Sequence, residues 1–179
     1  MRSIIGNYFL KKELKKIVRK REVFNFDDAH TIGILYDATD LDDRNMVHDF
    51  VKYLREKQKK VDSLGFINSK KHDKNLKTQL EFHYFTKKDL TWFLKPRCVD
   101  VENFLDKNHD ILIDLCIEKC FPIRYICGVS KAKFKVGRTG ENSAVIYDLM
   151  LNIEKKKTLE NYITQVKHYL SIINKKGTI

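Results

Sequence analysis

The sequence lacks most of the short motifs that identify a catalytic or phosphate-binding site. It contains neither G-x-G-x-x-G nor a Walker A sequence, which excludes the two commonest phosphate-binding loops. Ser130 has no G-x-S-x-G setting, which argues against the nucleophile turn of an α/β-hydrolase. The histidines include no pair four residues apart, so zinc is unsupported. We therefore expect no metal and no cofactor, and we favour a protein that is not an enzyme.

Long hydrophobic runs and paired cysteines are also absent. No run approaches the roughly 20 apolar residues that a transmembrane helix needs. Residues 4–10 are too short and too interrupted for a signal peptide, so a cytoplasmic location is expected. There is no C-x-x-C pair, and we expect reduced thiols that mostly pack as small apolar groups. The four cysteines are Cys98, Cys116, Cys120 and Cys127.

What the sequence does contain is an excess of positive charge. The 179 residues, 42% of them hydrophobic, are typical of one globular domain. Lysine and arginine total 35 against 24 aspartate and glutamate, a net charge of +11. This balance favours an anionic partner such as RNA, a ribosome or an anionic membrane surface. The alternative is a solvated basic surface without a partner, since most of the cations are lysines, which lack the bidentate guanidinium.

The charge is concentrated at the beginning of the chain. Residues 1–23 are predicted to form a basic amphipathic helix, because Leu10, Leu14, Ile17 and Val18 recur at helical spacing. The alternatives are anion binding by this helix, or packing of its apolar stripe with lysines left in water. The predicted anion-binding residues are Lys11, Lys12, Lys15, Lys16 and Arg19.

Residues 24–179 are predicted to form a single three-layer α/β/α Rossmann-like domain with a mostly parallel sheet. Its centre is residues 109–137, where the nearly unbroken apolar run 111–115 is typical of a strand covered on both faces. Pro122 suits the first turn of a helix, and the alternation of residues 133–136 predicts a following strand. This order predicts a right-handed βαβ unit.

Other strands and caps can be placed around this unit. We expect strands over residues 31–37, 61–68, 80–85 and 144–153, the last at a sheet edge. The cleanest periodicity predicts a final helix capped by Thr158. Thr86 with Asp89 resembles a capping box, and Asp100 is expected to cap a helix over the following residues.

An acidic loop follows the first predicted strand. Residues 37–43 contain four aspartates at the carboxyl end of a strand, where ligands bind in Rossmann-like sheets. Asp37, Thr39 and Asp40 form a possible ligand loop, whose carboxylates could hold Mg²⁺ or act as a general base. The alternative is helix capping by Asp42 or Asp43.

An aromatic pair lies in a basic setting further along the chain. Trp92 and Phe93 are accompanied by Lys87, Lys88, Lys95 and Arg97. Such a cluster could stack single-stranded bases, or it could plug the core beneath an exposed loop.

Two resemblances complete the sequence evidence. From about Phe24, the segments TIGILYDA, KDLTWF and SKAKFKVG resemble an uncharacterised family of small bacterial proteins typical of the Bacteroidota, which implies no activity. Residues 109–137 are similar to the amino-terminal Rossmann-like half of the heptosyltransferase-type glycosyltransferases, where Thr39 and Asp40 would take the place of a Gly-Asp pair.

These observations favour a small non-enzymatic protein that engages RNA or a ribosomal particle through its basic first helix. One alternative is a nucleotide-utilising enzyme with its site at residues 37–43. Another is a peripheral membrane protein without a transmembrane segment.

Overall fold

The computed structural model describes residues 2–69 and 82–174, which form an α/β fold around one six-stranded sheet. The strand order is β3-β2-β1-β4-β5-β6, and every pair of neighbours is parallel. The strands are β1 (Thr31–Asp37), β2 (Lys60–Ile67), β3 (Phe82–Thr86), β4 (Ile111–Asp114), β5 (Phe134–Arg138) and β6 (Leu149–Leu151).

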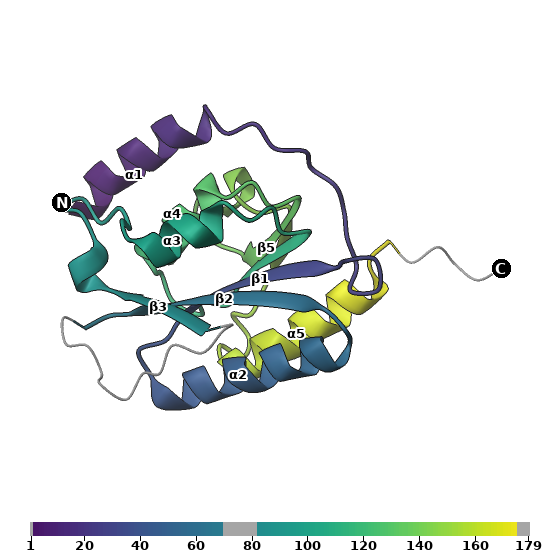
Figure 1. Ribbon diagram of the computed structural model, residues 1–179. Helices are drawn as coiled ribbons and strands as arrows, with labels where there is room; N and C mark the ends of the chain where they lie inside the picture. The colour runs from purple at the N-terminus through teal and green to yellow at the C-terminus, as the bar shows by residue number, and fades with distance from the viewer. Residues whose placement is uncertain (1, 70–81, 175–179) are drawn as a thin grey trace.

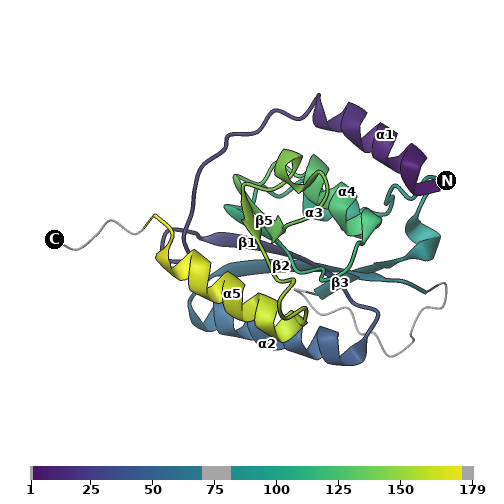
Figure 2. The ribbon, with the colours of Figure 1, turned by 180° about the vertical axis from the view of Figure 1, so that it is seen from behind.

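Helices cover both faces of this sheet, which confirms the predicted Rossmann-like α/β/α architecture. Figures 1 and 2 show α2 and α5 on one face, with α3 and α4 on the other and α1 outside them. The α-helices are α1 (Arg2–Leu14), α2 (Leu41–Glu56), α3 (Val99–Leu105), α4 (Phe121–Val129) and α5 (Leu159–Ile172). Two short 3₁₀ helices are η1 (Lys87–Asp89) and η2 (Ser143–Val145).

The predicted apolar strands occupy the centre of the sheet. β1 lies between β2 and β4, with Ile34 opposite Ser63 on one side and Ile113 on the other. Both faces of these strands are buried, because α2 and α5 cover one side while α3 and α4 cover the other. Unbroken apolar runs are therefore what this position requires. Gly65 allows β2 to lie close to the residue that follows β1, since a Cβ on Gly65 would be 2.7 Å from the Cβ of Ala38.

Some caps were predicted correctly and others were not. The capping box of Thr86 and Asp89 and the cap by Thr158 are confirmed. Asp40 caps α2 in place of Asp42 or Asp43, which lie in the first helical turn and donate their N–H groups to it. Asp100 was also placed wrongly: Cys98 is the N-cap residue of α3, and the Asp100 carboxylate lies 3.0 Å from His83 Nδ1.

The predicted edge strand 144–153 is wrong in its extent. Only β6 pairs with β5, although it does lie at the edge of the sheet. Asn142 adopts a left-handed conformation (φ 56°) and starts η2, so the chain turns instead of extending. The predicted strand at 80–85 corresponds to β3, while the rest of that prediction and most of the loop at 69–77 lie outside the described residues.

The first helix is shorter than predicted, because it ends at Leu14. Ile17 and Val18, counted in its apolar stripe, lie beyond the helix, and Val18 is 89% exposed. Residues 15–23 instead form a non-helical strap that leads towards β1 (Figure 1). The division of the chain into residues 1–23 and 24–179 stays a prediction.

Candidate functional site: an aromatic and basic surface

Helix α1 is attached to the domain by its small and apolar residues. Gly6 is buried, and a Cβ there would lie 2.6 Å from the carbonyl oxygen of Phe93 and 2.7 Å from the ring of Phe121. One turn further on, Leu10 is buried in the core cluster that includes α4. The side of α1 that carries Gly6 and Leu10 is therefore covered by the protein, while Ile4 and Tyr8 of the same helix are 72% and 66% exposed.

The opposite side of α1 carries the predicted anion-binding lysines. Lys11, Lys12, Lys15 and Lys16 are all exposed. Lys11 and Lys12 lie three and four residues after Tyr8, on the same side of the helix, and Lys15 follows just past its end. Lys16 lies just past the helix end, and its ammonium group is 3.7 Å from the Glu13 carboxylate in an exposed pair that contributes little energy. Four of the five predicted residues thus remain accessible to an anionic partner.

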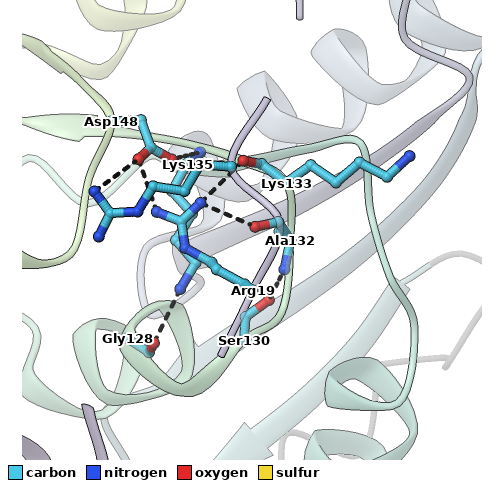
Figure 3. Close-up of polar contacts among 8 residues, drawn as sticks. Arg19, Gly128, Ser130, Ala132, Lys133, Lys135 and Asp148 are labelled. Carbon is cyan, nitrogen blue, oxygen red and sulfur yellow. Dashed lines mark hydrogen bonds and ion pairs between the residues drawn. The ribbon is translucent and has the colours of Figure 1, made fainter. Parts of the chain in front are cut away.

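Arg19 has a different environment. Its guanidinium donates to the Asp148 carboxylate at 2.7 Å and to the carbonyl oxygens of Ala132 and Lys133 (Figure 3). Its side chain is only 7% exposed. Because its donors are used within the protein, Arg19 ties the strap to the sheet, and we leave it out of the candidate surface.

The predicted aromatic pair lies on a tight loop, residues 90–96. Leu90 and Pro96 form an antiparallel bridge, and Thr91 N–H donates to the carbonyl oxygen of Lys95 at 2.9 Å. This closed loop presents Trp92 to solvent, with 62% of its surface exposed. Trp92 does not plug the core. Its exposed position fits base stacking better than a place beneath the loop.

The structure brings this loop and α1 together through ring contacts. Phe9 of α1 packs on Phe93 with ring centroids 4.7 Å apart. Tyr8 contacts Phe9 at 5.7 Å, and Trp92 contacts Phe93 at 5.4 Å. The two end rings, Tyr8 and Trp92, are 66% and 62% exposed. We call the set of Tyr8, Lys11, Lys12, Lys15, Lys16 and Trp92 the aromatic–basic surface.

Tyr8 and Phe9 were not identified from the sequence. In the sequence they appear only as an aromatic pair one helical turn before a cluster of lysines. That pattern is weak evidence for a binding surface when no other aromatic residue is near in the sequence. The neighbour of Phe9 is 84 positions away in the chain, so the contact depends on the complete fold.

The acidic loop at residues 37–43 uses its polar groups locally. Asp37 accepts hydrogen bonds from the N–H (3.0 Å) and hydroxyl (2.5 Å) of Thr39, whose Oγ1 in turn accepts from the N–H of Asn68. Asp40 accepts from the N–H groups of Asp42 and Asp43 at the start of α2. These contacts account for the loop as a turn followed by a helix cap.

The same loop borders a cavity of about 260 Å³ between the ends of β1 and β4. Burial, followed by the charges of Asp40 and Asp37, raises the pKa of Asp43. Such a negative crevice repels phosphate groups in the absence of a cation. Among residues 2–69 and 82–174, no group of three or more histidine, cysteine or carboxylate side chains is arranged to hold a metal ion.

The expected thiols and the lack of spanning helices can be compared with the structure. All four cysteines are free; Cys116 and Cys127 are buried, while Cys98 and Cys120 are half-buried. No helix in the described part of the chain has the length and apolar character needed to cross a bilayer.

Comparison with known proteins supports one of the two resemblances. No protein of curated function matches the chain, and the likeness to heptosyltransferase-type glycosyltransferases finds no support. The likeness to an uncharacterised family does find support. Residues 2–173 match the model of DUF6913, a family of unknown function, and because this match spans nearly the whole chain, the protein belongs to that family.

Proposed function

We propose that the protein binds RNA, free or within a ribosomal particle, through the aromatic–basic surface. The observation that carries the proposal is the packing of Phe9 on Phe93, which joins a lysine-bearing helix to a loop with an exposed tryptophan. Two features that were separate in the sequence thereby become one surface.

Each part of this surface matches one part of a single-stranded RNA. The lysines supply positive charge for the phosphate backbone, a contact that positions a strand without reading its sequence. The exposed rings of Tyr8 and Trp92 offer faces on which bases stack, which is worth about 1–3 kcal/mol per base. The expected ligand is therefore an unpaired segment of RNA, bound with little sequence preference.

The packing of α1 favours RNA over a membrane. An interfacial helix binds a bilayer by burying its apolar face among the lipids. In this protein that face, with Gly6 and Leu10, is already covered by the domain. On the exposed side, Lys11 and Lys12 suit a solvated polyanion and lie on the same helix as exposed Ile4 and Tyr8.

The test is RNA binding measured by fluorescence anisotropy with a labelled single-stranded oligonucleotide. If the four lysines neutralise four phosphates, affinity should fall about 50-fold between 50 and 200 mM salt. Replacing Lys11, Lys12, Lys15 and Lys16 together by glutamine should remove most of the binding and most of its salt dependence. The matched control replaces four exposed lysines elsewhere, Lys52, Lys57, Lys155 and Lys156, and should retain both.

Two results would contradict the proposal. One is the absence of binding at 50 mM salt. The other is equal loss in both quadruple variants, which would indicate attraction by net charge alone. Co-sedimentation with anionic vesicles in place of RNA binding would reassign the surface to a membrane.

A further inference from the structure

A second cavity, of about 400 Å³, lies at the carboxyl ends of β4 and β5. Asp114 ends β4 and Arg138 ends β5, and both side chains line it. The start of α4, at Cys120 and Phe121, forms another part of its wall. The carboxyl edge of a parallel sheet is where open α/β proteins bind their ligands, and the volume falls within the usual range of ligand sites. We call it the arginine cavity.

Two guanidinium groups line this cavity, and among the described residues their contacts with carboxylates are long or absent. Arg124 donates from Nη2 to the carbonyl oxygen of Asn142 at 3.0 Å, while its Nε is buried without a hydrogen-bond partner there. Arg138 donates to the carbonyl oxygen of Thr139 at 3.3 Å and comes no closer than 4.0 Å to the Glu154 carboxylate. Arg19, by comparison, has its carboxylate at 2.7 Å. Arg124 Nε has almost no exposed surface, so it is the terminal nitrogens of the two guanidinium groups that would meet an acceptor in the cavity.

The remaining charges of the cavity offset one another. Glu118 is paired with Lys157 at 2.7 Å, and Lys119 with Glu141 at 3.9 Å. Asp114 accepts a hydrogen bond from the hydroxyl of Tyr147 at 2.5 Å. Burial raises the pKa of the Asp114 carboxyl. Arg124 is thus the cation of the cavity lining with no ion pair among the described residues, while Arg138 has the Glu154 carboxylate at 4.0 Å.

The start of α4 adds a third source of donors. Cys120, its N-cap residue, makes no side-chain hydrogen bond to the first turn. Because Pro122 has no N–H, the uncapped first turn offers the N–H groups of Phe121 and Ile123, and the positive end of the helix dipole lies at the cavity wall. Donors from α4 and β5 suit the several terminal oxygens of a phosphate better than the two oxygens of a planar carboxylate.

We propose that the arginine cavity binds the phosphate group of a small organic molecule, held by Arg124 and Arg138 at the start of α4. This site is separate from the aromatic–basic surface. It also differs from the cavity beside the acidic loop, because two arginines line it and none lines that cavity.

The test is isothermal titration calorimetry with inorganic pyrophosphate at constant ionic strength. Wild-type protein should show saturable binding at one site. Arg124→Gln and Arg138→Gln should each weaken that binding by about 10-fold, the usual size of a lost charge-assisted hydrogen bond. Arg55→Gln on α2 should leave it unchanged, as should the quadruple lysine variant of α1, which separates this proposal from RNA binding.

Rim variants keep the test valid if an arginine variant fails to fold. Lys119 and Glu141 are 82% and 78% exposed, so Lys119→Gln and Glu141→Gln leave the fold intact. The first should weaken pyrophosphate binding and the second should strengthen it. No saturable binding, equal binding in every variant, or tighter binding of citrate than of pyrophosphate would overturn the proposal.

Discussion

Lys135 alternates with apolar residues in the strand predicted at residues 133–136, and the structure buries it. It lies in the middle of β5 and is 2% exposed, because the strap and α4 cover it. Its ammonium group donates to the carbonyl oxygen of Gly128 at 2.9 Å (Figure 3). Burial lowers the pKa of Lys135 to about 8. Periodicity alone could not reveal this, since a buried and an exposed lysine look identical in a two-residue pattern.

Lys135→Met should change the pH dependence of stability. The pKa of Lys135 is lower in the folded than in the unfolded state, so between about pH 8 and pH 10.5 the unfolded state binds more protons and the wild type gains stability as pH rises. This gain is up to about 3 kcal/mol, and the variant lacks it. Urea unfolding at pH 7 and pH 10, with exposed Lys131→Met as control, measures the difference. If the unfolding free energies of wild type and Lys135→Met differ by the same amount at both pH values, the ammonium group of Lys135 is not buried as described.

Asp110 has the opposite behaviour. Burial alone would raise its pKa, but hydrogen bonds from Lys133 and from the His30 and Thr31 N–H groups lower the pKa of Asp110 to about 2. The carboxylate therefore stabilises the fold above its unfolded pKa of about 4, and that contribution disappears as pH falls towards 2.

Asp110→Asn should accordingly destabilise the protein by about 2 kcal/mol at pH 6 and by much less at pH 2.5. Chemical denaturation at the two pH values checks this, with exposed Asp28→Asn as control. A loss of the same size at both values would mean that packing, and not the ionised carboxylate, is responsible.

The elements differ in how far the sequence could predict them. β1, α4 and α5 were placed within one or two residues, because their signals are local: an unbroken apolar run, a proline in the first turn, a steady helical period. The end of α1 and the extent of β6 depend on distant partners. Arg19 bonds to Asp148, 129 positions away, and this contact helps to hold the strap out of the helix.

The candidate sites follow the same division. The lysines and Trp92 were predicted because each belongs to a visible cluster. Arg124 and Arg138 were missed because each stands alone in the sequence, and Tyr8 was missed because its ring contacts reach the loop at 90–96 only in the fold.

Helix α1 is expected to depend on the close approach at Gly6. In Gly6→Val, the added side chain would meet the carbonyl oxygen of Phe93 and the ring of Phe121, and so push α1 away from the loop at 90–96. Hydrogen–deuterium exchange should rise throughout α1 while β1 and β4 stay protected. Lys12→Val, on the exposed side of the same helix, is the control; equal exchange in both variants would mean that α1 is not held by this contact.

At the scale of the whole molecule, the net charge of +11 is less informative than its placement. Part of it is used internally, as with Arg19. Another part lies on and just after α1, which is outside α3 and α4 (Figures 1 and 2), and the exposed rings of Tyr8 and Trp92 are linked there through Phe9 and Phe93. An excess of lysine without a partner would require no such neighbours, so the juxtaposition with Tyr8 and Trp92 is what favours RNA.

Trp92 offers the most direct measurement, because it is the one tryptophan of the chain and lies on the proposed surface. Titration with unlabelled single-stranded RNA should quench its fluorescence in a saturable and salt-sensitive way, since a base stacked on the indole changes its environment. Tyr8→Ala should weaken the titration about 10-fold, and the quadruple lysine variant should abolish it. RNA that binds by anisotropy yet leaves Trp92 fluorescence unchanged would contradict the surface proposed for it.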